Sequence, residues 1–370
     1  MLLTPVDNSA IVAALAAALD GGPAVLPLSA DDPRAGELRS AMAPGEPTLP
    51  GTAVVVATSG STGAPKGVEL SATALRASAA ATHERLGGPG QWLLTLPANH
   101  IAGVQVVVRS LLAGFGPVLR GTRPFADAVR SMTGPRRYTS LVPTQLVRLL
   151  DDPVGLEALC SFDAVLLGGA AAPASLVDRA RAAGVRVSTT YGMSETAGGC
   201  VYDGQPLDGV RVRLSDGVIS LAGPTLASGY RRDPVGTSAA FVDGWFRTTD
   251  IGELSADGTL SVSGRADFVI NTGGVKVAPA AVEAVLAEQA GVAEVCVVDL
   301  PDAEWGQLVA AAVVPVDGSS PPLVDDLRAA VRARLGGPAA PRLVRFVTAL
   351  PLRGPGKVDR SGVRDVLRGS

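Results

Sequence analysis

The sequence predicts an α/β fold: a large N-terminal domain with mostly parallel, doubly wound sheet layers and a small β subdomain, then a small α+β C-terminal domain. Three observations predict it. Up to residue 189, short β-branched runs alternate with helix-forming segments, as in parallel sheets connected by helices. After residue 205 the segments shorten and Asp-Gly pairs punctuate them, which indicates antiparallel hairpins. From residue 267 onward, helix and strand patterns alternate over a length typical of a separate domain.

The individual elements follow from caps, propensities and breakers. Asn8 and Ser71 are N-cap candidates before helix-forming runs, and the glycine pair at 21–22 ends the first run. The Pro/Gly-rich stretch up to Gly51 predicts a connector. We expect helices at residues 8–19, 71–86, 101–112, 143–150, 173–183, 279–289 and 323–335. We expect strands at residues 24–28, 53–57, 92–96, 117–119, 138–142, 164–167, 185–189, 210–214, 218–221, 245–248, 260–262, 292–300, 308–314 and 343–347.

Composition excludes several classes of protein. The 370 residues have a formal net charge of −3 and dispersed basic residues, which argues against nucleic-acid binding. Charged residues interrupt the apolar runs before they reach membrane-spanning length, and the N-terminus lacks the basic segment of a signal peptide. We therefore expect a cytoplasmic protein without membrane insertion. Cys160, Cys200 and Cys296 lack CxxC spacing, which indicates buried apolar side chains rather than zinc ligands or disulfides.

Residues 58–67 (TSGSTGAPKG) are predicted to hold a phosphate chain. Gly60 and Gly63 allow backbone angles that turn successive N–H groups toward an anion. Lys66 supplies a compact charge, and it is one of only three lysines in a chain that otherwise uses arginine. Proline before Lys66 and glycine after it distinguish the loop from a P-loop. The hydroxyl donors are Thr58, Ser59, Ser61 and Thr62.

Six motifs in order resemble the acyl-adenylate-forming superfamily of acyl-CoA synthetases, luciferases and peptide-synthetase adenylation domains. The first is the loop at 58–67, and the second, at 191–196 (YGMSET), is similar to an aromatic-Gly-x-(Ser/Thr)-Glu motif. Residues 245–250 (WFRTTD) resemble the family's ribose-binding segment, with Thr249 in place of glycine. Residues 264–267 (GRAD), 273–279 (GGVKVAP, with Glu283 following) and 351–360 (PLRGPGKVDR) resemble the hinge and closing motifs.

The resemblance implies a substrate carboxylate that attacks ATP, so the protein has to position groups and neutralise charge. It implies that Lys66, Thr62 and Glu195 act on the leaving phosphates, with Glu195 and Thr62 holding Mg²⁺. Lys357 would bridge the attacking carboxylate and the α-phosphate. The implied ATP and AMP contacts are Thr58, Ser59, Gly60, Ser61, Thr62, Gly63, Lys66, Gly168, Gly169, Ala170, Tyr191, Gly192, Met193, Ser194, Thr196, Asp250 and Arg265.

The family also implies a division of the chain and a second substrate. Residues 1–264 would form the ATP- and acyl-binding domain, residues 265–267 the hinge, and residues 268–370 a mobile domain that carries Lys357. That domain would guide coenzyme A along the face near Gly273 and Gly274, and Asp267 matches the hinge position. Lys276 departs from the residue usual in the family, so a contact with a phosphate of coenzyme A and a surface role are both open for it. The phosphate loop comes much earlier than in full-size members, which predicts that most of an N-terminal subdomain is missing. The sequence leaves a homodimer open.

Two stretches look like the o-succinylbenzoate-CoA ligase branch of menaquinone biosynthesis. They are residues 96–109 and residues 197–209. A substrate with two carboxylates needs a cation or strong donors for the one that is not activated, and Arg109 is a candidate. The expected acyl pocket comprises His100, Gln105, Arg109, Gly169 and Gly192. The alternatives are a CoA ligase for another aryl or short-chain acid, and an inactive nucleotide-binding regulatory protein.

Overall fold

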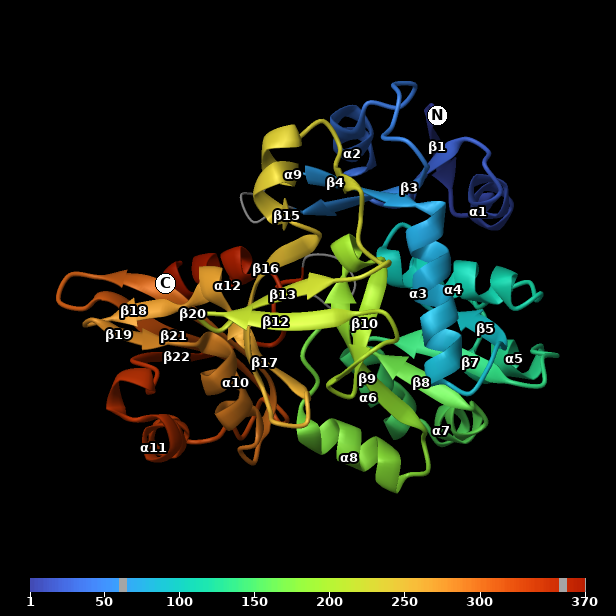
Figure 1. The fold of residues 1–370 in the computed structure, drawn as a ribbon. Coiled ribbons are helices and arrows are strands. Elements are labelled where there is room, and N and C mark those ends of the chain that lie inside the picture. The colour runs from blue at the N-terminus through green and yellow to red at the C-terminus, as the bar shows by residue number, and fades with distance from the viewer. Residues whose placement is uncertain (60–64, 353–357, 370) are drawn as a thin grey trace. The chain divides into compact units, whose positions relative to one another are not determined.

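The computed structural model describes residues 1–59, 65–352 and 358–369 (Figure 1). The chain divides into two compact units. The first comprises Met1–Arg213, Ser220–Thr248 and Gly258–Leu260, and the second comprises Leu214–Ile219, Thr249–Asp257 and Ser261–Ser370. The predicted boundary at residue 264 and the hinge at 265–267 stay predictions.

The first sheet of unit 1 has the order β1-β2-β3-β4-β14. Strands β1 to β3 run parallel, and β4 pairs antiparallel with both β3 and β14. Helix α2 packs on one face through Met42, and α1, α3 and α4 pack on the other. The elements are β1 (Leu3–Asp7), α1 (Ile11–Leu19), β2 (Ala24–Leu28), α2 (Ala35–Met42), β3 (Thr52–Ser59), β4 (Pro65–Ser71), α3 (Ala72–Arg85), α4 (Ile101–Leu112) and β14 (Gly229–Tyr230).

The second sheet has the order β11-β10-β9-β8-β7-β5-β6. Strands β9, β8, β7, β5 and β6 are parallel, which confirms the mostly parallel layer. Helices α5 to α8 cover one face through a cluster that includes Phe125, Leu146, Phe162 and Val177. The elements are β5 (Gln91–Leu94), β6 (Val118–Leu119), α5 (Phe125–Arg130), β7 (Arg137–Leu141), α6 (Pro143–Asp151), α7 (Pro153–Cys160), β8 (Ala164–Leu167), α8 (Ala174–Ala182), β9 (Val187–Met193), β10 (Gly198–Tyr202) and β11 (Gln205–Pro206).

The shorter elements after residue 205 form a third sheet, as the Asp-Gly pairs predict. Its order is β12-β13-β16-β15, and β17 pairs with β16. Asp216 and Asp243 have positive φ angles of 51°, a conformation that Asp tolerates better than most residues in tight turns. The elements are β12 (Arg211–Ser215), β13 (Val218–Ala222), α9 (Pro234–Ala240), β15 (Phe241–Val242), β16 (Trp245–Leu254) and β17 (Leu260–Arg265).

The second unit contains a sheet of order β19-β18-β21-β20, with β22 paired to β21. Helices α10 and α11 pack on one face through Leu286 and Val331, and α12 packs on the other through Val363 and Leu367. This is the predicted α+β arrangement. The elements are β18 (Ile270–Thr272), β19 (Val275–Val277), α10 (Pro279–Ala287), β20 (Val292–Asp302), β21 (Gly306–Pro315), α11 (Val324–Leu335), β22 (Leu343–Phe346) and α12 (Arg360–Arg368).

Several local predictions were wrong. Helix α1 begins at Ile11 and its N-cap is Ala10, so Asn8 does not cap it. The connector before Gly51 contains α2, whose inward face has only Leu38 and Met42 and therefore leaves a weak pattern. Ser71, in contrast, caps α3 as predicted, because its hydroxyl accepts from the Ala74 N–H at 3.0 Å.

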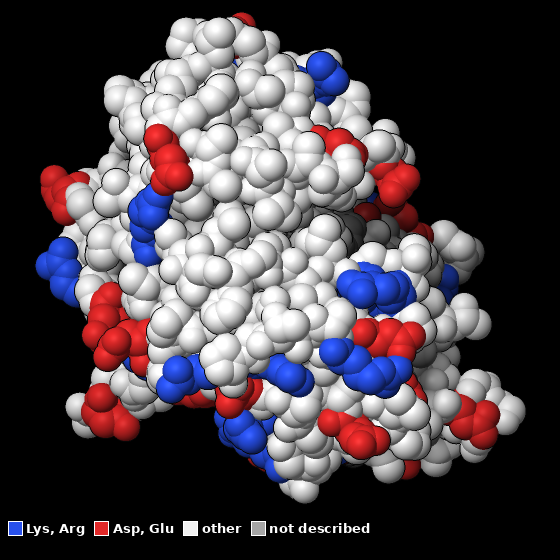
Figure 2. Space-filling view, turned by 90° about the vertical axis from the view of Figure 1, so that its right-hand side faces the viewer, with Lys and Arg blue, Asp and Glu red and all other residues white. Residues whose placement is uncertain are grey.

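The surface agrees with the composition, and two of the three cysteines are buried as predicted. On the face drawn in Figure 2, basic and acidic side chains of the described residues are interspersed, and neither sign forms a continuous patch. Cys200 and Cys296 are buried, and burial raises the pKa of each thiol to about 12. Cys160 is only half-buried, and its thiol donates to the Ala183 carbonyl at 3.3 Å. Among the residues that the structure describes, no helix is long and apolar enough to cross a membrane.

Candidate functional site

The predicted phosphate loop connects β3 and β4, two antiparallel strands. Thr58 lies opposite Lys66 and Ser59 lies opposite Pro65, and the Thr58 hydroxyl donates to the Lys66 carbonyl at 3.2 Å. The hairpin therefore fixes both ends of the loop, unlike a P-loop, which leads from a strand directly into a helix. Gly60, Ser61, Thr62 and Gly63 lie outside the described residues.

Gly67, directly after Lys66, allows close packing at the base of this hairpin. A Cβ at Gly67 would overlap the Met42 sulfur of α2 and would lie 3.0 Å from Arg231 Cβ. The glycine is thus explained by packing beneath the loop. Lys66 itself is half-buried.

Lys66 and Glu195 meet the same side chain, Tyr230. The Tyr230 hydroxyl donates to Glu195 Oε1 at 3.0 Å, and Lys66 Nζ lies 5.1 Å from the centroid of the Tyr230 ring. Burial raises the pKa of the Tyr230 phenol, and the Glu195 carboxylate raises it further, so the phenol remains a donor. The structure therefore brings together two residues whose motifs lie far apart in sequence. Sequence reasoning missed Tyr230, because β14 is only two residues long and has no period.

The motif at 191–196 comprises the end of β9 and the 3-10 turn Ser194–Thr196. The Met193 N–H donates to the Thr196 hydroxyl at 2.9 Å, and that hydroxyl donates to the Gly198 carbonyl at 2.7 Å. A Cβ at Gly192 would overlap the same carbonyl, so glycine is needed for the hairpin with β10. Thr196 is fully buried and its hydroxyl closes this turn, which carries Glu195.

Gly168, Gly169 and Ala170 directly follow β8, at the carboxyl end of the parallel sheet. A Cβ at Gly168 would overlap the Thr190 hydroxyl, and that hydroxyl donates to the Leu167 carbonyl at 3.2 Å. Gly169 has a φ of 81°. The segment thus lies against the residue before Tyr191, so two of the predicted nucleotide-binding motifs are neighbours. In open α/β sheets this is the edge at which ligands bind.

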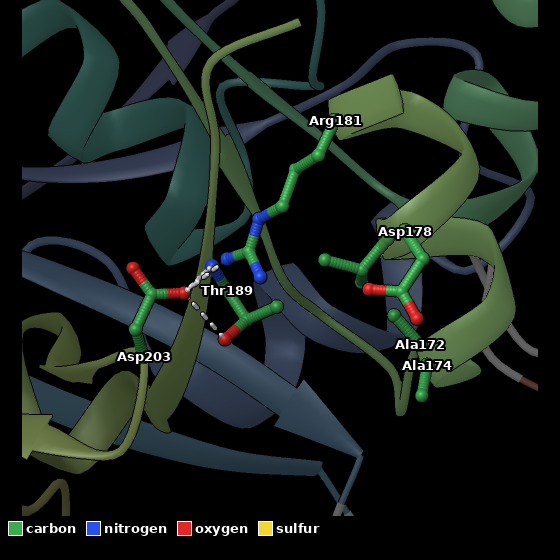
Figure 3. A pocket seen from close by; sticks show the side chains of 7 residues that line it. Ala172, Ala174, Asp178, Arg181, Thr189 and Asp203 are labelled. Atoms are coloured by element: carbon green, nitrogen blue, oxygen red, sulfur yellow. Dashed lines mark hydrogen bonds and ion pairs between the residues drawn. The ribbon is translucent and has the colours of Figure 1, made fainter. Parts of the chain in front are cut away.

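A hollow of about 340 Å³ lies beside this edge and is drawn in Figure 3. On one side Asp203 accepts hydrogen bonds from Arg181 at 3.2 Å and from the Thr189 N–H at 2.9 Å. Asp178 on α8 lies on the opposite side (Figure 3). Because Arg181, Thr189 and Asp203 are bonded to one another, the hollow itself shows no built ligand site. The other lining residues are Ala172, Ala174 and Val177.

Three of the five expected acyl residues lie on α4 or at its N-terminus, while Gly169 follows β8 and Gly192 lies in β9. His100 is its N-cap and half-buried, whereas Gln105 and Arg109 are buried within unit 1. Arg109 is 3 % exposed, lies 5.0 Å from the Trp92 ring and donates to the Tyr202 hydroxyl at 3.2 Å.

The charge of Arg109 lacks a carboxylate partner among the described residues. Among the described residues, Arg109 Nε also has no hydrogen-bond acceptor, and Gln105 Oε1 has no hydrogen-bond donor. Burial lowers the pKa of the Arg109 guanidinium. A buried cation without an anion is costly, and a bound carboxylate would offset that cost.

Arg265, expected near the ribose, forms a bidentate pair with Asp267 of the predicted hinge at 2.9 and 2.7 Å. Its guanidinium also lies 5.0 Å from the Phe268 ring, as does that of Arg360. Arg360 in turn binds both oxygens of Glu283 at 2.8 and 3.0 Å. The last two matched motifs are thus tied together inside unit 2. Asp250 lies in β16, and Lys357 lies outside the described residues.

Gly273 and Gly274 form the turn between β18 and β19. A Cβ at Gly273 would overlap the Trp305 ring, and its N–H donates to the Trp305 carbonyl at 2.9 Å. Lys276 is exposed on β19, opposite Asn271. Gly273 therefore lets the Trp305 ring pack beneath this turn, whereas Gly274 is required only by its φ of 84°.

The residues that could hold a divalent cation are few. In the described part of the chain, no three His, Cys, Asp or Glu side chains gather as a metal cluster. Glu195 is the expected metal ligand whose side chain is described. A single carboxylate supplemented by substrate phosphates is a common way to hold Mg²⁺, so the donor set fits that ion.

Comparison with known proteins supports the same chemistry. Residues 7–230 match the family model described as AMP-binding enzyme, and residues 281–357 match that of the AMP-binding enzyme C-terminal domain. A probable 2-succinylbenzoate–CoA ligase of Mycobacterium tuberculosis is 50% identical over 335 residues, which cover 88% of this chain and 87% of that relative.

Two solved structures of o-succinylbenzoate CoA synthetase from Bacillus subtilis are similar in fold. One, in complex with the acyl-adenylate intermediate OSB-AMP, has a TM-score of 0.75 at 27% identity and covers 96% of this chain and 80% of that one. The other, in complex with ATP and a magnesium ion, has a TM-score of 0.73 at 28% identity and covers 87% and 70%. By motif, fold and sequence identity, the chain belongs to the AMP-binding enzyme family.

Proposed function

We propose that this chain ligates o-succinylbenzoate to coenzyme A through an acyl-adenylate, a step of menaquinone biosynthesis. The observation that carries the proposal is the 50% identity to a probable 2-succinylbenzoate–CoA ligase over 88% of the chain. The buried cation Arg109 supports the dicarboxylate, because the carboxylate that is not activated would neutralise it. His100, Gln105, Gly169 and Gly192 complete the proposed pocket.

In the first step the ionised carboxylate attacks the α-phosphate of ATP, and pyrophosphate leaves. Lys66, with the loop residues Thr58 to Gly63, neutralises the leaving phosphates, and Lys357 bridges the attacking carboxylate and the α-phosphate. Glu195 and Thr62 would hold Mg²⁺, which supplies charge neutralisation at the phosphates when it is bound. Tyr191 and residues 168–170 would contact adenine, and Asp250 with Arg265 the ribose. Met193, Ser194 and Thr196 shape the turn that presents Glu195.

In the second step the thiolate of coenzyme A attacks the acyl carbonyl, and AMP leaves. We assign Gly273, Gly274 and Lys276 to the binding of coenzyme A. Residues 265–267 would be the hinge about which the C-terminal domain rotates between the first and the second half-reaction. ATP and coenzyme A are cytoplasmic metabolites, so we expect the chain there. Self-association as a homodimer stays a prediction that sedimentation would test.

The experiment is acid-dependent release of pyrophosphate from Mg·ATP with a panel of carboxylates. We expect o-succinylbenzoate to exceed benzoate, acetate and a fatty acid in kcat/KM by at least about a hundredfold, the value of one well-placed charged contact. A preference for benzoate or a fatty acid would identify a ligase for another acid. If none of the acids causes release of pyrophosphate, the alternative of an inactive nucleotide-binding regulatory protein would be favoured.

A further inference from the structure

Tyr230 contacts two of the charged side chains to which the proposed function assigns phosphates and metal. Its hydroxyl bonds Glu195, and its ring lies against the Lys66 ammonium. None of the matched motifs contains it. We propose that Tyr230 is a positioning residue of the adenylation step: it orients the Glu195 carboxylate toward Mg²⁺ and holds the Lys66 ammonium at the exit of the phosphate loop. This inference rests on the proposed function for the roles of Glu195 and Lys66.

The pairing of β14 with β4 places the ring next to Lys66. Tyr230 lies opposite Val68 in this antiparallel pair. Lys66 is two residues from Val68 on the same strand, so Lys66 and Tyr230 are diagonal neighbours on one face of the sheet, within reach of long side chains. The register of β14 against β4 therefore fixes the contact between the Lys66 ammonium and the Tyr230 ring.

The backbone before Tyr230 is bonded to the turn that carries Glu195. The Ala227 N–H donates to the Glu195 carbonyl at 2.8 Å, while the Tyr230 hydroxyl bonds the carboxylate of the same residue at 3.0 Å. Glu195 is thus held through both its main chain and its side chain by one short segment, 227–230. Such bonds to a metal-ligating carboxylate fix its orientation and raise metal affinity.

The ring has little freedom to move. Phe241 packs edge-on against it at 5.7 Å between centroids, and the Tyr230 N–H donates to the Thr237 hydroxyl at 2.8 Å. A Cβ on the preceding residue, Gly229, would lie 2.7 Å from Thr237 Cγ2, so glycine is needed for this close approach to α9. A rigid ring can hold its two charged neighbours in place before ATP arrives, which lowers the entropy cost of binding.

Two variants separate the hydroxyl from the ring. Tyr230→Phe removes the bond to Glu195, and Tyr230→Leu also removes the ring from Lys66. We would measure Mn²⁺ binding by electron paramagnetic resonance in the presence of α,β-methylene-ATP, which cannot be cleaved at the reacting bond. We would measure binding of the same nucleotide by calorimetry in EDTA.

We expect Tyr230→Phe to weaken Mn²⁺ binding to the nucleotide complex about tenfold, the usual cost of losing a partner of a metal ligand. Its metal-free nucleotide affinity should stay unchanged. Tyr230→Leu should in addition weaken metal-free nucleotide binding about threefold, the value of a cation–π contact. In catalysis, Tyr230→Phe should slow pyrophosphate release and leave thioester formation from supplied acyl-adenylate unchanged.

Tyr138→Phe is the matched control, because its buried hydroxyl donates to the Leu86 and Gly88 carbonyls at 3.1 and 3.0 Å. It should lower thermal stability without changing Mn²⁺ binding. In a Glu195→Gln background, Tyr230→Phe should add no further loss, since the hydroxyl acts through Glu195. Unchanged Mn²⁺ affinity in Tyr230→Phe, or fully additive losses, would overturn the proposal. Neither binding assay contains an acyl acid, so both assays still test the role of Tyr230 if o-succinylbenzoate turns out not to be the substrate.

Discussion

Arg231 and Glu69 form an ion pair inside unit 1: Arg231 Nη1 lies 3.3 Å from Glu69 Oε1, and the two side chains are 2 % and 3 % exposed. Oε2 of Glu69 accepts from the Leu49 N–H at 2.7 Å and from the Thr52 hydroxyl at 2.9 Å. The remaining guanidinium donors bond main-chain carbonyls of residues 42, 43, 46 and 47. This pair joins the strand after the phosphate loop to the residue after Tyr230.

Arg231→Met should lower the free energy of unfolding by about 3–5 kcal/mol, because it leaves the Glu69 carboxylate buried without its cation. Urea denaturation measures this. Arg34→Met is the control, since Arg34 pairs with Glu37 at the surface and its loss should cost under about 1 kcal/mol. Equal losses in the two variants would contradict a structural role for the buried pair.

Arg109→Met tests the acyl pocket. Arg109 is a buried cation with no carboxylate partner among the described residues, so its replacement should leave the free energy of unfolding unchanged or raise it. The KM for o-succinylbenzoate should rise about ten- to a hundredfold, the cost of a lost charge-assisted bond, while the KM for ATP stays constant. Loss of stability with an unchanged KM would assign Arg109 to the core alone.

Lys357→Ala should abolish pyrophosphate release but spare formation of the thioester from supplied acyl-adenylate, because the role proposed for its ammonium, on the attacking carboxylate and the α-phosphate, belongs to the first step alone. The two half-reactions are assayed separately. Lys276→Ala is a useful comparison, since its assigned partner is coenzyme A and it should affect the second half-reaction alone. Equal loss of both half-reactions in Lys357→Ala would refute the assigned role.

Asp250→Ala should weaken ATP binding at least about tenfold, since a carboxylate that accepts both ribose hydroxyls makes two charge-assisted bonds. Calorimetric titration with α,β-methylene-ATP measures it. Asp208→Ala, which changes an exposed carboxylate, is the control and should bind as the parent chain does. Unchanged affinity of Asp250→Ala would remove Asp250 from the nucleotide site.

The lowered pKa of His83 should make the free energy of unfolding depend on pH. Burial, with the Arg109 charge adding to it, lowers its pKa to about 4, from 6.5 in the unfolded chain. The folded state therefore favours the neutral ring, and between pH 6.5 and pH 4 the unfolded chain binds a proton that the folded chain does not. The contribution of His83 to the free energy of unfolding should therefore be constant above pH 6.5 and fall by about 3 kcal/mol in total as the pH falls toward 4. Unfolding free energies between pH 4 and 7 for the parent chain and His83→Gln measure it. Parallel curves for the two proteins would exclude the effect.

The sequence pattern predicted the elements whose signals are local. Helix α4 begins at Ile101 and ends at Leu112 as predicted, because an apolar run follows a clear break at Pro97. The strand β4 was missed, since residues 65–71 owe their extended form to pairing with β3 rather than to their own propensity. The motifs assigned to the nucleotide were found by resemblance, and their roles stay predictions. Tyr230 was not found in this way, because its proposed role depends on contacts with Lys66 and Glu195 that only the folded chain creates.

The pairing of β4 with β14 places Lys66 relative to Tyr230 independently of the number of residues between Ser59 and Pro65. Side chains alternate between the faces of a strand, so deleting one residue between Lys66 and Val68 would turn the Lys66 ammonium to the other face of the sheet, away from Tyr230. Libraries that search for altered nucleotide specificity should therefore vary the residues between Ser59 and Pro65 and leave residues 65–68 unchanged.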